Sequence, residues 1–361
     1  MRVRVIVIVV VAALAPCATS TRAAPAEQQR PLVIAAVGDL MLGSTFPRAR
    51  LPPRDGRRLL AAVAPILRAA DVAFGNLEGP LFDGGQQPRC TPGGILERNH
   101  GRPGGKTCWA FRMPARYGKL LAAAGFDVLS LANNHIDDFG LAGRHATIKT
   151  LHALGVRYSG PTGSVAHVTV RGVRLAVIAF ATYKGLNDLR DLDAARALIG
   201  KAAREADLVM VSFHGGAEGR RAQRVPRREE IFFGESRGAV RAFAHAVIDA
   251  GADLVVGHGP HVLRGLEIYK GRLVAYSLGT FASYGGINVR GVLGRTMILE
   301  VALGKDGRFV RGRVRPVRQR VPGGPRLDRS ARVLRTLRRL SRLDFGARAP
   351  RIAANGAISA P

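Results

Sequence analysis

Short apolar segments that end in polar residues recur along this chain and constrain its fold more than any other feature. Seven of them are predicted as strands, at 32–39, 71–78, 125–135, 174–183, 206–218, 251–262 and 271–281. Their near-continuous Val, Ile and Leu content is typical of strands buried on both faces of a sheet. Helical patterns lie between most of them, at 57–70, 115–125, 143–155, 193–206 and 239–251. Strands that alternate with helices predict an α/β fold.

Polar side chains gather where the predicted strands end. Ligands of open α/β sheets bind beyond the carboxyl ends of the strands, so we expect one common site there. The candidate ligands are, in chain order, Asp39, Glu78, Asn134, His135, His214, His258 and His261. Carboxylate, amide oxygen and imidazole together suit one or two divalent ions such as zinc, manganese or iron. A pair of ions would clamp the attacking and leaving oxygens of a hydrolysed bond.

Several of these residues also have a structural explanation. Asp39 could be a turn carboxylate, Glu78 could pair with an arginine, and a buried His214 could simply be hydrogen-bonded. In "SLANNHIDDFG", at 130–140, the Asn and Asp side chains could cap the following helix. The sequence "GHGPH" is harder to explain in this way, because its Gly and Pro residues display two histidines on a stiff turn.

The formal net charge of +29 implies acidic partners or an arginine-rich solvated surface. Residues 301–361 contain 16 Arg and Lys against 3 Asp. Their first part is predicted as an edge hairpin and "SARVLRTLRRLSRL" as an amphipathic helix, either docked on the domain or facing an anionic surface. The last dozen residues are predicted to lack regular structure. Nucleic acid is not an expected partner, because aromatics make up only 6% of the chain and none cluster with the arginines.

The first 24 residues are typical of a signal peptide. Arg2 and Arg4 precede an apolar run that ends at Ala15, and cleavage is expected near Ala23 or Ala24. A lipoprotein box at "LAPC" and an uncleaved anchor are the alternatives, and each places the chain in the periplasm or on the extracellular face. In an oxidising compartment Cys90 and Cys108 would form a disulfide that closes a Gly-rich loop.

Six motifs in order carry a resemblance to a known family: "GDLMLG", "NLEGPL", "LANNHIDDFG", "HGGAE", "GADLVVGHGPHV" and "AYSLGTF". The chain resembles the bacterial CapA family of capsule and poly-γ-glutamate synthesis proteins, within the calcineurin-like metallophosphoesterase superfamily. The resemblance implies a four-layer αββα sandwich over residues 32–300, preceded by the signal peptide (1–24) and followed by a basic C-terminal extension (301–361).

The resemblance also assigns roles to residues. It places Asp39, Glu78, Asn134, His214, His258 and His261 as metal ligands and His135 as a general acid toward the leaving oxygen. Met41 stands where the superfamily has a histidine ligand, and Thr280 where the CapA pattern usually has Asn. Glu218 could replace the missing ligand. In the charged loop at 218–238, Glu218, Arg220 and Arg221 are the candidate substrate-binding residues, with Arg224 and Arg227 nearby, unless this is an ordinary solvated loop.

The resemblance implies a role in making, exporting or anchoring a capsule polymer such as poly-γ-glutamate. We expect a metal-dependent hydrolase that acts on an anionic polymer or a phosphate ester. The alternative is a non-catalytic scaffold that binds the polymer and assists membrane proteins of capsule synthesis or export. Arginine pairs well with the carboxylates of such a polymer in either case.

Overall fold

The computed structural model describes residues 30–85, 88, 109–320 and 322–361. The signal peptide expected at 1–24 and the disulfide expected between Cys90 and Cys108 lie outside the described residues. Residues Pro31–Pro361 belong to one unit, which the following paragraphs describe.

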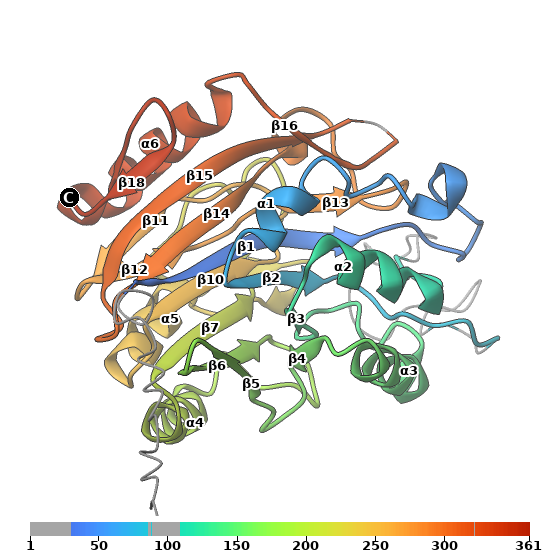
Figure 1. Cartoon of the computed structure of the whole chain (residues 1–361), viewed down its shortest axis with the longest axis horizontal. Helices are drawn as coiled ribbons and strands as arrows, with labels where there is room; N and C mark the ends of the chain where they lie inside the picture. The colour runs from blue at the N-terminus through green and yellow to red at the C-terminus, as the bar shows by residue number, and fades with distance from the viewer. Residues whose placement is uncertain (1–29, 86–87, 89–108, 321) are drawn as a thin grey trace, which may run out of the picture. The chain divides into compact units, whose positions relative to one another are not determined.

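Two large sheets form the centre of this unit (Figure 1). The first runs in the order β17-β18-β15-β14-β1-β2-β3-β4, with β13 paired to β1 and β16 paired to β15. Its strands are β1 (Leu32–Met41), β2 (Val72–Leu77), β3 (Val128–Ser130), β4 (Arg157–Ser159), β13 (Thr280–Ser283), β14 (Arg295–Leu303), β15 (Phe309–Gln319), β16 (Pro325–Leu327), β17 (Arg351–Ile352) and β18 (Ala357–Ser359).

The second sheet runs in the order β11-β12-β10-β7-β6-β5. Its strands are β5 (Ala166–Val170), β6 (Val173–Phe180), β7 (Leu208–His214), β10 (Leu254–His258), β11 (Leu266–Tyr269) and β12 (Arg272–Ala275). A separate ribbon joins β8 (Ile231–Phe232) and β9 (Glu235–Ser236). The helices are α1 (Ala64–Arg68), α2 (Gly118–Ala124), α3 (Gly140–Ala153), α4 (Leu192–Glu205), α5 (Val240–Asp249) and α6 (Arg332–Phe345), with short 3-10 turns at Pro53–Gly56, Ala115–Tyr117, Gly291–Gly294 and Gly346–Arg348.

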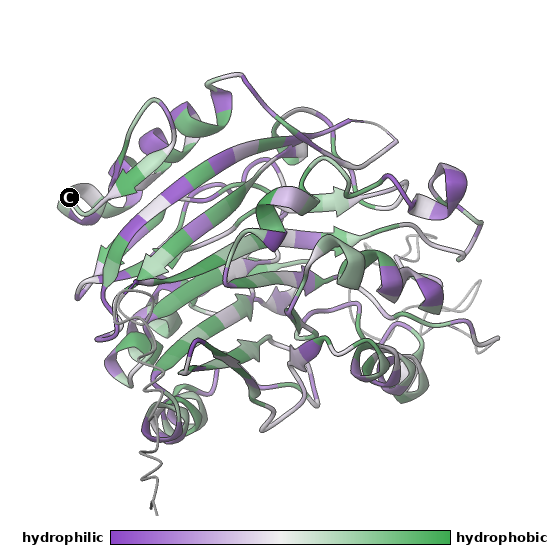
Figure 2. Ribbon diagram, viewed as in Figure 1, coloured by the Kyte–Doolittle hydropathy of each residue, from purple (hydrophilic) through white to green (hydrophobic). Residues whose placement is uncertain are grey.

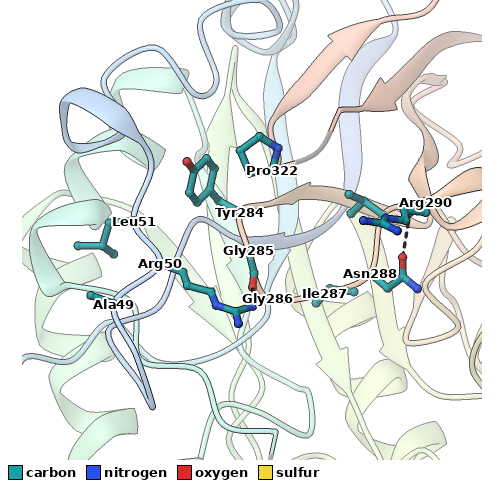
Figure 3. Close-up of a pocket in the computed structure, with 11 residues that line it drawn as sticks. Ala49, Arg50, Leu51, Tyr284, Gly285, Gly286, Ile287, Asn288, Arg290 and Pro322 are labelled. Carbon is teal, nitrogen blue, oxygen red and sulfur yellow. Dashed lines mark hydrogen bonds between the residues drawn. The ribbon is translucent and has the colours of Figure 1, made fainter.

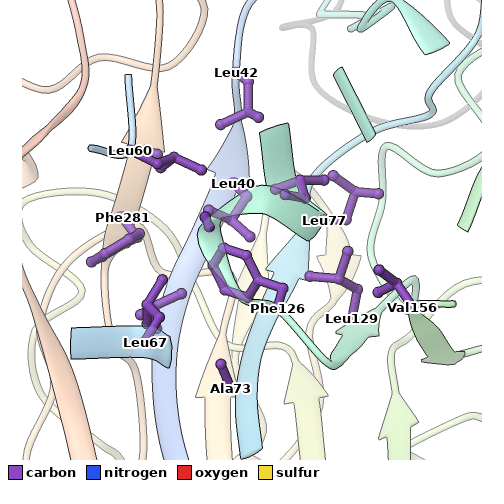
Figure 4. Close-up of a cluster of buried hydrophobic side chains, with 14 of the residues drawn as sticks. Leu40, Leu42, Leu60, Leu67, Ala73, Leu77, Phe126, Leu129, Val156 and Phe281 are labelled. Carbon is purple, nitrogen blue, oxygen red and sulfur yellow. The ribbon is translucent and has the colours of Figure 1, made fainter. Parts of the chain in front are cut away.

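The side-chain alternation of the strands creates three hydrophobic layers. In β1, Ile34 and Ala36 face the second sheet, whereas Ala35 and Val37 face the helices on the outer side. Figure 4 shows part of that outer layer, where Leu67 of α1 and Phe126 lie near Leu40. A third layer packs α4 and α5 on the far face of the second sheet. The four-layer αββα sandwich is therefore confirmed.

One predicted helix is much shorter than expected. The pattern at 57–70 forms only turns followed by the five residues of α1. Pro65 lies in the first turn of α1. Proline fits a first helical turn but has no N–H to continue a helix that begins earlier in the chain.

The C-terminal residues 301–361 continue the fold of the rest of the unit. They complete β14, add β15 to the first sheet and end in α6 and a strand pair. Five apolar residues of α6 are buried, namely Val333, Leu334, Leu337, Leu340 and Phe345. The prediction that the last dozen residues lack regular structure was wrong, because β18 pairs with both β15 and β17. Figure 2 shows β14 largely hydrophobic, whereas hydrophilic and hydrophobic residues alternate along β15.

Among the residues that the structure describes, no helix is both long enough and apolar enough to cross a membrane.

Candidate metal centre

The carboxyl ends of four parallel strands bring the site together. Strands β1 and β2 pair in parallel with Asp39 opposite Asn76, and Glu78 follows β2 directly. In the second sheet, β7 and β10 pair in parallel with His214 opposite His258. Because the two sheets face each other, the ends of these strands meet between the layers.

Asp39 is the centre of the cluster. Its Oδ2 lies 2.9 Å from Nδ1 of His261 and its Oδ1 lies 3.3 Å from Nδ1 of His258. The carboxylate is only 1% exposed. Burial by itself would raise the pKa of Asp39, but the contacts with the two imidazoles hold that pKa well below its ordinary value. Asp39 is therefore a buried, ionised carboxylate.

Glu78 lies beside Asp39 and is fully buried. Burial raises the pKa of Glu78 well above its ordinary value, and the neighbouring charge of Asp39 raises it further. Asn76 separates the two carboxylates. Its Nδ2 donates to Asp39 Oδ1 at 3.0 Å and to Glu78 Oε2 at 2.7 Å. Asn76 thus determines which carboxylate oxygens remain available, and Oε1 of Glu78 accepts no hydrogen bond from any described residue.

Two histidines of the second sheet complete the buried part of the cluster. His214 Nδ1 lies 3.7 Å from Glu78 Oε2, and burial lowers the pKa of His214 well below its ordinary value. Within the described residues, Nε2 of His214 and Nε2 of His258 have no hydrogen-bond partner. Buried polar atoms nearly always have a hydrogen-bond partner. A buried imidazole nitrogen that has no such partner is available to bind a metal ion.

His261 reaches Asp39 from the turn that follows β10. Its backbone has φ of 55°, a left-handed conformation that is unusual for a residue with a side chain. Gly259, two residues earlier, lies so close to Gly215 that an added Cβ would be 3.1 Å from the Gly215 backbone. The "GHGPH" turn therefore packs directly on the "HGG" turn, and this contact brings His258 and His261 beside His214.

The electrostatics of His261 show that this place favours a positive charge. Burial would lower the pKa of His261, but the bond to Asp39 and the charges of Glu218 and Glu78 outweigh it and raise that pKa to about 10. Asp39, Glu78 and His261 each offer one ligand atom, and these atoms lie within 4.8 Å of one another. The donor set of carboxylates and imidazoles, with its unpartnered buried atoms, fits a divalent cation.

The turn after β3 carries the second part of the site. Asn133 Nδ2 donates to Asn76 Oδ1 at 3.1 Å and to the carbonyl of Leu77 at 2.8 Å. Asn133 Oδ1 in turn accepts from the backbone N–H of His135 at 3.1 Å. Asn134 is half-buried in the same turn. The amide pair of Asn76 and Asn133 therefore ties the turn of Asn134 and His135 to the carboxylates.

Asp138 orients the His135 ring. Its Oδ2 lies 2.9 Å from His135 Nδ1 and also accepts from the Phe111 N–H at 2.7 Å. The Phe111 ring packs on the imidazole, with centroids 4.3 Å apart. The carboxylate contact at Nδ1 and the packing of Phe111 fix the orientation of the His135 ring.

The expectation that these acidic residues cap the next helix was wrong. Asp138 binds His135, and Asp137 pairs with the buried Arg144 through Oδ1 and Nε at 2.8 Å. Helix α3 has Phe139 at its N-cap and no side-chain cap. Carboxylates that cap a helix and carboxylates that orient a histidine can occupy the same sequence positions, so only the tertiary contacts distinguish them.

The charged loop after β7 is held by buried arginines. The fully buried Arg237 pairs with Glu218, whose other oxygen lies 3.7 Å from His261 Nε2. Arg237 also contacts the hydroxyl of Tyr183. Glu218 therefore lies beside the cluster but is already engaged by an arginine.

The other predicted substrate-binding residues of this loop divide into two groups. Arg220 and Arg221 are exposed, and Arg220 lies near the turn at Gly291. Arg224 does not face the site, because its guanidinium pairs with Asp344 of α6.

Met41, which departs from the superfamily pattern, and Thr280, which departs from the CapA pattern, have defined places. Met41 is fully buried, and its methyl group packs against Gly286 rather than pointing into the cluster. Thr280 lies opposite Asp39 in the pairing of β1 and β13. The Thr280 hydroxyl has no hydrogen-bond partner among the described residues.

Sequence reasoning missed Asn76 and Arg237, and it assigned Asn133 and Asp138 no role at the site beyond possible helix capping. A signal for Asn76 was present, because residues two apart in a strand face the same side and Asn76 precedes Glu78 by two. Asp138 could have been suspected from its spacing of three from His135. No sequence signal indicates Arg237, since its partners are distant along the chain.

Comparison with known proteins agrees with the motifs. The family described as "Bacterial capsule synthesis protein PGA_cap" matches residues 33–284. The "PGA biosynthesis protein CapA" of Bacillus subtilis is 28% identical over 262 residues, which cover 68% of this chain and 61% of that protein. The "Capsule biosynthesis protein CapA" of Bacillus anthracis is 30% identical over 271 residues, covering 69% of this chain and 59% of that protein.

Among solved structures, the putative 5'-nucleotidase of Staphylococcus aureus is similar, with a TM-score of 0.44 and 13% identity over 83% of this chain and 55% of that one. The chain spans about three fifths of the length of the two curated CapA relatives. The family match covers the strands, the turns and the side chains that build the site, from Asp39 to Thr280. On this match, the chain is a member of the bacterial capsule synthesis family PGA_cap, to which the CapA motifs already pointed.

Proposed function

We propose that this protein is a metal-dependent hydrolase of capsule polymer synthesis that acts on an acidic polymer or a phosphate ester in the cell envelope. The observation that carries the proposal is the buried cluster of Asp39, Glu78 and three histidines. Asp39, Glu78 and His261 bring one ligand atom each within 4.8 Å of one another, while Nε2 of His214 and of His258 have no partner among the described residues. A group of this kind binds one or two divalent ions such as manganese, zinc or iron.

Each residue has a role in this proposal. Asp39, Glu78, Asn134, His214, His258 and His261 would hold the metal. A bound divalent ion would polarise the scissile bond and lower the pKa of a water molecule. His135, with Nδ1 held by Asp138 and its ring packed on Phe111, would donate a proton to the leaving oxygen. Asn76 would keep Asp39 and Glu78 in position through its two hydrogen bonds.

Surface hollows beside His135 support a long anionic substrate. One hollow of about 230 Å³ is lined by Phe111, Trp109 and Arg48. It shares Arg50 with a second hollow of about 510 Å³, which reaches Arg290 (Figure 3). The arginines can pair with carboxylates or phosphates along this path.

The alternative is a scaffold that binds the polymer without cleaving it and assists export. Two observations favour it. Met41 offers no good ligand for a hard divalent ion, and Glu218, which could replace that ligand, is already paired with Arg237.

Metal analysis and turnover together distinguish the two functions. We would purify the protein with and without Asn134→Ala and His261→Ala together, and measure bound metal and hydrolysis of poly-γ-glutamate and of a phosphodiester. His167→Ala, which removes an exposed histidine of β5, is the matched control. The proposal predicts stoichiometric metal and turnover in the parent and the control, and neither in the double variant. Equal metal in all three would end the site assignment, and metal without turnover would favour the scaffold.

A further inference from the structure

Four arginines line a surface hollow that the metal centre does not use. The hollow measures about 320 Å³ and is lined by Arg295, Arg332, Arg335, Thr336 and Arg339. Arg332, Arg335 and Arg339 lie on successive turns of α6 and share one side of that helix. Arg295 is the first residue of β14. Segments far apart along the chain thus direct positive charge to one place.

Two further arginines extend this group along the sheet. Arg295 lies directly opposite Arg318 of β15, and Arg318 lies directly opposite Arg326 of β16. Paired residues of antiparallel strands point to the same face, and like charges placed opposite each other are destabilising. We call the six residues the arginine patch: Arg295, Arg318, Arg326, Arg332, Arg335 and Arg339.

The arginine patch differs from neighbouring arginines in having no carboxylate partner. Among the described residues, none of its six guanidinium groups forms an ion pair, because the carboxylates of this region pair with other arginines. Arg315 pairs with Glu300, Arg224 with Asp344 and Arg348 with Glu267. Acidic side chains of this region therefore neutralise arginines outside the patch and leave the patch itself uncompensated.

We propose that the arginine patch is a second binding surface for an acidic polymer, apart from the metal centre. The ligand class is a chain that carries carboxylates at short intervals. Cross-strand arginines are about 4.8 Å apart, and successive turns of a helix are about 5.4 Å apart. At these spacings, neighbouring arginines of the patch can each contact one of the successive carboxylates of a single polymer chain. Guanidinium forks bind carboxylates with two parallel hydrogen bonds, which favours arginine over lysine in such a surface.

The packing of α6 argues against a membrane as the partner. A helix that lies in a lipid interface exposes an apolar face to the acyl chains. In α6 that face is in the protein core, where Val333 and Leu337 are fully buried. Leu343 is the one apolar residue of α6 that is strongly exposed, at 53%. The arginines surround a hollow, which suits a ligand that enters it better than a flat bilayer.

This inference takes the acidic polymer from the proposed function but does not depend on the metal centre. The test measures binding of fluorescently labelled poly-γ-glutamate by anisotropy at several salt concentrations. The patch variant carries Arg332→Gln, Arg335→Gln and Arg339→Gln, which keep good helix formers in α6. The control carries Arg57→Gln, Arg58→Gln and Arg204→Gln, three arginines exposed elsewhere. Both variants change the net charge equally, from +29 to +29 − 3 = +26.

We expect the patch variant to bind about tenfold more weakly, since three exposed ion pairs with the polymer would be removed. Its affinity should also depend less on salt, while the control stays within about twofold of the parent. Equal weakening in both variants would overturn the proposal, because net charge alone would then explain binding. The proposal would also be overturned if the patch variant lost binding to vesicles containing phosphatidylglycerol while its binding of the polymer was unchanged.

A variant with Asp39→Asn and His261→Ala separates this inference from the proposed function. The patch should still bind polymer when the metal centre is disabled. If this variant alone abolished polymer binding and the patch variant did not weaken it, the second surface would be refuted. Loss of turnover in the same variant, with patch-dependent binding retained, would support both proposals independently.

Discussion

Replacement of Asn76 by alanine tests whether one buried amide organises the whole site. The Asn76 side chain is fully buried and donates to Asp39 at 3.0 Å and to Glu78 at 2.7 Å. It also accepts from Asn133 at 3.1 Å, which connects the carboxylates to the turn of His135. Asn76 thus links both carboxylates to this turn through its own hydrogen bonds.

The size of the effect follows from these bonds. A hydrogen bond to a charged group contributes about 1.5–3 kcal/mol, so loss of two would cost about 3–6 kcal/mol. Glu78 can relax part of this by binding a proton, because its pKa is already raised by burial and by Asp39. We therefore expect the metal-free Asn76→Ala protein to lose about 3 kcal/mol in its free energy of unfolding. Because residues that orient metal ligands typically change affinity 10- to 100-fold, we expect a Mn²⁺ dissociation constant raised by about that factor.

Urea unfolding followed by circular dichroism in the presence of a chelator measures the first quantity, and competition with a chelating dye measures the second. Asn76→Asp keeps the side-chain volume but removes the donor, so it should lose stability in chelator as Asn76→Ala does. Asn355→Ala, in an exposed turn near the C-terminus, is the control. Unchanged unfolding midpoint and unchanged metal affinity in Asn76→Ala would refute the reasoning. If Asn76→Asp were as stable as the parent, the stability loss of Asn76→Ala would come from the cavity left by the smaller side chain and not from the lost hydrogen bonds.

Three further predictions concern single residues. If the proposed function holds, Asp138→Asn should lower turnover about 10- to 100-fold with bound metal unchanged, since the carboxylate orients His135; a parallel loss of metal would contradict this role. Arg237→Met should cost about 3–5 kcal/mol in urea unfolding because Glu218 and Glu235 would lose a buried partner, and adding Glu218→Gln should restore part of that loss. Burial would raise the pKa of Glu267, but the bonds from His245 and Tyr276 and the charge of Arg348 hold it below its ordinary 4.5. A carboxyl with a lowered pKa stabilises the fold above its unfolded-state pKa, and this contribution is lost as the pH falls through the folded-state pKa. Glu267→Gln should therefore flatten the loss of stability below pH 4.5, and an unchanged acid profile would exclude Glu267 as a source of that loss.

Much of the architecture could be predicted from the sequence because it depends on local periodicity. Apolar runs in segments such as 32–39 and 206–218 identified strands buried on both faces, and helical patterns between them gave the α/β class. Periodicity predicted a helix over 57–70 that is too long, because Pro65 lies in the first turn of α1 and cannot continue an earlier helix. It also failed at the C-terminus, where β18 is ordered through pairing with β15 and not through any pattern of its own.

The sequence by itself determined which side chains are available at the strand ends, since Asp39, His214 and His258 lie at the ends of apolar runs that are predicted as strands. What those side chains touch was decided by the tertiary structure alone. The meeting of Asp39 with His261 requires two different sheets to face each other. Likewise, whether Asp138 caps a helix or orients His135, and whether Arg224 faces a substrate or Asp344, depends on contacts between distant segments. Hydrogen bonds and ion pairs act over a few ångströms in space, and a linear sequence does not record those distances.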